Sequence, residues 1–208
     1  MNRLNNILLL SMLVNGAFLV SSANAKDPHI SYNYVDAGYL YLEADDAVYG
    51  ADADGDGWDV KGSGAVHPNI HLFAGYSEVG LDFDVDLTMW EAGIGYNYSI
   101  ADKTSLFATV AYADAKAESG SVSDDDNGYA LGVGVRHMLV TDYIRASAID
   151  GIEFLGGVDY ADYGDLGEET AFSAGVLFHV NSFLGIGLEG AWGGDTTSYF
   201  AGLRFTLD

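Results

Sequence analysis

Three aspartates in a glycine-rich run are the residues whose spacing most suggests chemistry. Asp52, Asp54 and Asp56 lie in the run Asp-Ala-Asp-Gly-Asp-Gly, which copies the start of a calcium-binding loop. Such a loop has oxygen ligands at positions 1, 3 and 5, a glycine at position 6 and a bidentate glutamate at position 12. Position 12 is Ser63 here. The run therefore predicts either a solvated acidic turn or a calcium site with a Kd of about 10⁻⁴–10⁻³ M; no other cofactor is expected.

A second group of charged residues stands at alternate positions within apolar or glycine-rich segments. Because neighbouring side chains of a β-strand point to opposite faces, these residues share one face if the segments are strands. Their three bases and six acids can form a network of ion pairs, since a buried charge without a partner is costly. We expect Arg136 and Arg204 to hold carboxylates such as Glu91 and Glu189. The group consists of Asp36, Asp59, Lys61, Glu91, Arg136, Glu153, Asp159, Glu189 and Arg204.

Segments with a period of two must position these residues, and ten such segments can be marked. Short turns, such as those at 67–69, 101–103 and 181–183, alternate with more acidic connections at 43–57, 80–86, 116–127, 162–169 and 193–197. The predicted strands are Ser31–Leu42, Trp58–His67, Ile70–Val79, Leu87–Ile100, Thr104–Ala115, Gly128–Leu139, Gly151–Ala161, Thr170–Val180, Leu184–Trp192 and Ser198–Leu207.

The aromatic residues indicate which face of the strands meets an apolar medium. In the fourth segment Trp90, Ile94 and Tyr96 share one face, and Glu91 and Gly95 share the other. An apolar outer face with Tyr and Trp at the strand ends is typical of a transmembrane β-barrel. Ten tilted residues also cover about 25 Å, the height of the apolar band of such barrels. The sequence predicts an all-β fold, a single antiparallel transmembrane β-barrel of ten strands, with eight strands as the alternative. A soluble β-sandwich or lipocalin-like barrel would need the aromatic face turned inward.

The first residues have the pattern of a secretory signal peptide. Arg3 precedes a mostly apolar run at 7–20, and Ala23-Asn24-Ala25 is the small-x-small pattern of a cleavage site. An uncleaved membrane anchor would need about 20 apolar residues. We therefore expect a signal peptide at 1–25 and a barrel domain at 26–208. Export of amphipathic strands indicates the outer membrane of a Gram-negative cell.

The composition excludes several classes of partner and chemistry. The chain has 208 residues and a formal net charge of −23, so it would repel nucleic acid. It has no cysteine, which excludes disulfides, thiolate metal sites and a cysteine nucleophile. Its 27 glycines suit a curved sheet with a crowded interior.

Several stretches resemble a family of small bacterial outer-membrane β-barrels of Ax type. They include Ser31–Val35, the run from Asp52 to Trp58, Gly64–His71, Gly93–Tyr98 and Phe200–Phe205. The resemblance covers nearly all of residues 26–208 and implies a porin-family architecture without catalytic residues. It also implies a C-terminal strand that the assembly machinery reads. Gly202, Phe205 and Leu207 fit that signal, with Asp208 where an aromatic residue is expected.

An enzyme would need a base near the acidic outer connections. Ten-stranded outer-membrane proteases use histidine with aspartates at the outer rim. The histidines here are predicted at the opposite ends of the strands, at 67, 71, 137 and 179, with His29 before the first strand. We therefore expect no enzymatic activity.

The sequence favours an integral outer-membrane β-barrel with a structural or surface-interaction role and acidic extracellular loops. A narrow cation-preferring porin is the alternative, because an interior of ten strands is only slightly wider than one of eight, which side chains fill. The expected partners are outer-membrane lipid and lipopolysaccharide, together with the barrel assembly machinery and periplasmic chaperones during biogenesis.

Overall fold

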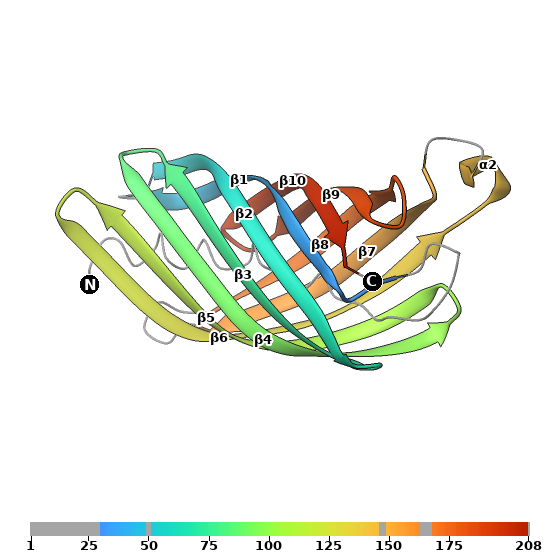
Figure 1. Ribbon diagram of the computed structural model, residues 1–208. Helices are drawn as coiled ribbons and strands as arrows, with labels where there is room; N and C mark the ends of the chain where they lie inside the picture. The colour runs from blue at the N-terminus through green and yellow to red at the C-terminus, as the bar shows by residue number, and fades with distance from the viewer. Residues whose placement is uncertain (1–29, 49–50, 146–148, 163–167, 208) are drawn as a thin grey trace.

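Ten antiparallel strands close into a barrel in the computed structural model, which describes residues 30–48, 51–145, 149–162 and 168–207 (Figure 1). Each strand pairs with its neighbours along the chain, and the first strand pairs with the last to close the sheet. The predicted ten-stranded antiparallel barrel is confirmed, and the eight-stranded alternative is wrong. The predicted signal peptide at 1–25 lies outside the described residues.

The strands differ in length, from 9 residues in β9 to 18 in β6. One short helix, α2 (Asp142–Arg145), lies between β6 and β7, and no helix in the described part of the chain is long and apolar enough to cross a membrane. The strands are β1 (Tyr34–Val48), β2 (Ala51–His67), β3 (Ile70–Leu81), β4 (Val85–Ala101), β5 (Thr104–Ser119), β6 (Val122–Leu139), β7 (Gly151–Asp162), β8 (Glu168–His179), β9 (Leu184–Trp192) and β10 (Thr196–Thr206).

The two ends of the barrel are distinguished by their connections. The end that holds the start of β1 and the end of β10 is termed the base end, and it also carries the turns at 68–69 and 102–103. The opposite end is termed the tip end and carries the turns at 82–84 and 120–121. Figure 1 shows α2 toward the base end and the β5–β6 hairpin reaching far toward the tip end.

The strands continue further toward the tip end than the sequence predicted. Most of the expected connections at 43–57 and 116–127 belongs to β1, β2, β5 and β6. In β2, Asp54 and Asp56 are exposed on the outer face, and Ala53 is buried on the inner face. In β5, Ala115 and Ala117 are buried on the inner face in the same way. Acidic composition suggested loops, but acidic side chains outward and small side chains inward form a regular strand pattern.

A tight turn joins β3 to β4 in place of the predicted connection at 80–86. Phe83 and Asp84 both have positive φ, at 65° and 55°. The two positive φ angles reverse the chain within the three residues 82–84. Leu81 and Val85 therefore remain register partners at the very end of the hairpin. Their buried side chains belong to the lumen packing described below.

Gly57 marks a close approach of β2 to β3. A Cβ atom on Gly57 would collide with the backbone carbonyl oxygen of Glu78, which the sheet holds in place. Gly62 lies on the same strand, and nothing lies within 4 Å of a Cβ atom added there. The two glycines therefore form a matched pair for testing the approach.

We predict that Gly57→Ala lowers the free energy of unfolding by about 1–3 kcal/mol, the usual cost of inserting a methyl group into a filled space. Gly62→Ala should change it by less than about 1 kcal/mol, because the added methyl group meets no atom. Urea unfolding of the detergent-folded protein measures both. Equal losses in the two variants would contradict the close approach.

Candidate functional site

The outer face of the barrel changes polarity along the barrel axis. Toward the base end its exposed side chains are apolar, among them Ile94, Leu106 and Val133. Next come aromatic side chains in contact across neighbouring strands, with ring centroids 5.2–6.3 Å apart. Beyond them, toward the tip end, exposed residues such as Asp54 and Asp86 are acidic. The aromatic belt consists of Trp58, Tyr76, Trp90, Tyr112, Tyr129 and Tyr160.

The charged layer nearest the base end of the lumen is built on β6, β7 and β8. Arg136 Nε donates a hydrogen bond to Glu153 Oε1, and His179 Nε2 lies 3.1 Å from Glu153 Oε2. Arg136 and Glu153 are completely buried. The carboxylate of Glu153 thus has a partner at each oxygen, which is the arrangement that a buried ion requires.

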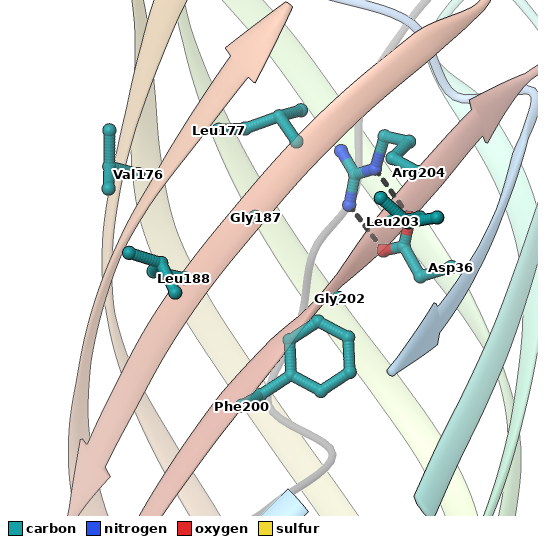
Figure 2. Close-up of a pocket in the computed structure, with 9 residues that line it drawn as sticks. All are labelled: Asp36, Val176, Leu177, Gly187, Leu188, Phe200, Gly202, Leu203 and Arg204. Carbon is teal, nitrogen blue, oxygen red and sulfur yellow. Dashed lines mark hydrogen bonds and ion pairs between the residues drawn. The ribbon is translucent and has the colours of Figure 1, made fainter. Parts of the chain in front are cut away.

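The second arginine lies at the seam that closes the barrel. Arg204 on β10 and Asp36 on β1 are register partners. Nε and Nη2 of Arg204 donate to the two oxygens of Asp36 at 2.7 and 2.6 Å, as Figure 2 shows. The ring of Tyr34 lies 3.8 Å from the guanidinium carbon of Arg204. A bidentate pair is stronger and more specific in geometry than a single contact, so it fixes the first strand against the last.

Lys61 provides the other cation at this level of the lumen. Its Nζ lies 3.8 Å from Asp59 Oδ2, and its ammonium also interacts electrostatically with Glu189, Glu91 and Asp36. Ser173 donates a hydrogen bond of 3.2 Å to Asp159 on the same face. The middle layer is defined as Asp36, Asp59, Lys61, Glu91, Asp159, Glu189 and Arg204. It contains more acids than bases.

Toward the tip end the lumen is filled with apolar side chains. Leu40, Leu42, Val79 and Leu87 are 0% exposed. The larger side chains come from β1, β3 and β4, and they meet alanines from β2, β5, β7 and β8. The apolar plug is defined as Leu40, Leu42, Ala44, Ala53, Val79, Leu81, Val85, Leu87, Met89, Ala113, Ala115, Ala117, Ala161 and Ala171.

Aromatic side chains fill the base end of the lumen. Tyr32, just before β1, is 1% exposed, and its ring stacks on His71 with centroids 4.3 Å apart. Tyr34 is 2% exposed and packs with Tyr32 against the partly buried Phe73. Tyr32, Tyr34 and Phe73 are termed the aromatic closure. The charged layers therefore lie between the aromatic closure and the apolar plug.

The nine charged residues of the predicted network face the lumen, but the two arginines bind other carboxylates than the sequence predicts. Arg136 and Arg204 bind Glu153 and Asp36, whereas the sequence had suggested Glu91 and Glu189 as partners. Strand register explains the difference, because Asp36 lies opposite Arg204 while Glu91 lies between Gly75 and Ala113 of the neighbouring strands. Eight of the nine residues are buried, and Glu189 is partly buried.

The three aspartates of the predicted calcium site lie in a strand and not in a loop, and calcium binding stays a prediction. Asp52, Asp54 and Asp56 are exposed on the outer face of β2, a regular strand. Alternate residues of a strand lie about 6–7 Å apart, too far for three carboxylates to reach one ion at about 2.4 Å. Among the described residues no group of three or more histidines and acids has the geometry of a metal site.

Two other sets of predicted residues can be placed. His71, His137 and His179 lie toward the base end, as predicted, and His137 Nδ1 lies 2.9 Å from Thr104 Oγ1. For the predicted assembly signal, Gly202 and Phe205 lie in β10, and Leu207 directly follows it. The assembly role of these three residues stays a prediction.

The apolar plug is the feature that sequence reasoning missed. Its signal was present in the alternation Val79-Gly-Leu81 and Val85-Asp-Leu87-Thr-Met89. Because acidic residues and glycine stand between the apolar ones, the sequence predicts a connection at 80–86 within this stretch.

Comparisons with solved structures find other barrels at low identity. The KdgM porin is 11% identical, with a TM-score of 0.45, and the match covers 84% of this chain and 99% of that chain. Neisserial surface protein A is 15% identical with a TM-score of 0.44, covering 85% of this chain and 98% of that one. Ail, the attachment invasion locus protein of Yersinia pestis, is 13% identical with a TM-score of 0.37, covering 83% and 97%.

No family model matches the chain, and no curated protein matches it either. The barrel assignment rests on the strand pairing described above.

We predict that Arg204→Ala lowers the free energy of unfolding by about 3–5 kcal/mol, because it leaves the buried Asp36 carboxylate without its partner. Lys116→Ala is the matched control: it breaks an ion pair with Glu118 of 2.8 Å whose side chains are 42% and 51% exposed. Its cost should be much smaller than that of Arg204→Ala, because solvent screens an exposed pair.

A double-mutant cycle of Arg204→Ala with Asp36→Ala, followed by urea unfolding, measures the coupling directly. A coupling no larger than that of the Lys116–Glu118 pair would contradict the assignment of the seam contact.

Proposed function

We propose that this chain is an integral β-barrel of a bacterial outer membrane with a closed lumen and a structural or surface-interaction role. The observation that carries this proposal is the apolar plug. Leu40, Leu42 and Leu87 are 0% exposed, so side chains and not water fill the lumen at the tip end. An interior of this kind supports a wall or a display scaffold better than an open pore.

The membrane placement follows from the outer face. A belt of exposed apolar side chains, bordered by aromatic pairs such as Trp58–Tyr76 and Trp90–Tyr112, suits the hydrocarbon region and its interface. The charged residues lie inside, where they find partners from other strands. Lipid and lipopolysaccharide are the proposed surroundings, with the assembly machinery and periplasmic chaperones as partners during biogenesis.

In this proposal the tip end of the barrel projects beyond the membrane. There Asp54 and Asp86 face outward, and the inward side chains of β1, β3, β4 and β5 form the apolar plug, which is the arrangement of a water-soluble barrel. The hairpins β3–β4 and β5–β6 therefore carry a rigid, negatively charged wall outward from the aromatic belt. Such a wall is suited to contact with other molecules at the cell surface. Membership of the Ax-type family is part of the same proposal.

A narrow cation-preferring channel is the second candidate. The excess of carboxylates over bases in the middle layer favours cations over anions. This role would require the apolar plug to move, because its buried side chains occupy the lumen at the tip end.

We predict no stable single-channel steps when the wild-type protein is reconstituted into planar bilayers. Leu40→Ala/Leu42→Ala/Leu87→Ala removes three large side chains from the apolar plug and should produce steps, because the remaining plug residues on the opposite wall are mostly alanines.

The matched control, Leu72→Ala/Leu106→Ala/Leu131→Ala, removes the same atoms from exposed positions on the outer face and should stay silent. Stable steps from the wild-type protein would overturn the closed-lumen proposal in favour of the channel.

A further inference from the structure

Within the described ranges, three carboxylates of the middle layer have no base directly opposite them on a neighbouring strand and none within ion-pair distance on their own strand; Asp59, also without an opposite base, has Lys61 at 3.8 Å. Glu91 lies between Gly75 on β3 and Ala113 on β5. Asp159 lies between Gly132 on β6 and Ala171 on β8.

Glu189 repeats this arrangement, between Gly175 on β8 and Phe200 on β10. Directly opposite residues of paired strands share a face and are the closest cross-strand neighbours. None of these three acids can therefore form the kind of register pair that joins Asp36 to Arg204.

Burial also limits the contact of these three side chains with water. Glu91 is 6% exposed and Asp159 8% exposed, and the Oε2 atom of Glu189 is buried without a hydrogen-bond partner. Asp159 accepts one hydrogen bond from Ser173, and no hydrogen bond or ion pair joins Glu91 to another residue in the described part of the chain. The aromatic closure and the apolar plug bound the compartment at its two ends.

The cations that face this compartment are too few for its acids. Arg204 is engaged in the bidentate contact with Asp36. The Lys61 ammonium interacts with Asp59, Glu189 and Glu91 at once. The charged groups at this level are Asp36 on β1, Asp59 and Lys61 on β2, Glu91 on β4, Asp159 on β7, Glu189 on β9 and Arg204 on β10.

We propose that Glu91, Asp159 and Glu189 form a buried proton-binding site, and that release of these protons to solvent at higher pH loosens the barrel. An ionised carboxylate in an apolar surrounding is far less stable than the neutral acid, which needs no counter-ion. In the unfolded chain the same groups ionise near pH 4. The inference rests on the closed lumen proposed above, because an open lumen would hydrate the three groups.

The sign of the pH dependence follows from proton counting. Above about pH 4 the unfolded chain has released the protons that the folded chain still holds at these groups. Stability therefore falls as pH rises, by up to about tenfold in the unfolding equilibrium constant per pH unit for each proton retained.

The test is the urea midpoint of the full-length protein in detergent micelles, measured from pH 5 to pH 8. We expect the wild-type midpoint to fall across this range. In the variant Glu91→Gln/Asp159→Asn/Glu189→Gln, which keeps neutral groups of similar shape, the midpoint should stay constant. Glu91→Gln alone should remove part of the slope, which keeps the test informative if the triple variant does not fold.

The control variant Asp54→Asn/Asp86→Asn/Asp125→Asn removes three exposed outward carboxylates and should keep the wild-type slope. A flat wild-type profile, or a slope that persists in the triple lumen variant, would overturn the proton site. A wild-type midpoint that is constant with pH but rises with added sodium or calcium would overturn it in favour of an inorganic cation.

Conductance measured on the same preparation separates the two proposals. A silent wild-type protein with a flat pH profile contradicts only the proton site. A conducting wild-type protein contradicts the closed lumen on which that site depends.

Discussion

Closing ten strands into a barrel encloses a space that is close in width to the reach of its own inward side chains, and this constraint shapes the rest of the molecule. Every second residue of every strand must fit beside neighbours from the opposite wall. The lumen meets this requirement with aromatic rings at the base end, ion pairs in the middle and aliphatic side chains at the tip end. Closure itself is fixed at the β1–β10 seam, where Asp36 and Arg204 meet.

Along the barrel axis, the inner and outer faces exchange polarity near the aromatic belt. Below it, apolar residues face outward and charged residues face inward, the arrangement required where lipid surrounds a barrel. Above it, Asp54 and Asp86 face outward while Leu42 and Leu87 face inward, the arrangement required in water. In the proposed membrane placement, one continuous sheet is surrounded by lipid below the belt and by water above it. The apolar plug is then the core of the portion that water surrounds.

Period-two alternation was sufficient to predict the number of strands and the inward direction of the charged residues, because side-chain direction is a local property of a strand. Pairing across the lumen could not be predicted in this way. Asp36 and Arg204 are 168 residues apart, and their contact depends on the register at which the whole sheet closes. The extension of the strands through Asp52, Asp54 and Asp56 was missed because acidic composition outweighed an alternation in which the inward partners are only alanine and glycine.

The central claim is that the lumen is packed and dry at the tip end, and the reactivity of adjacent cysteines tests it most directly. The chain has no cysteine of its own, so Leu87→Cys and Asp86→Cys can be compared on an unreactive background. Leu87 is 0% exposed inside the plug, and Asp86 is exposed on the outer face of the same strand. We expect a small water-soluble thiol reagent to modify Asp86→Cys rapidly and to leave Leu87→Cys unmodified until the protein is unfolded. Equal rates at the two positions would show that water reaches the plug, and they would contradict the closed lumen.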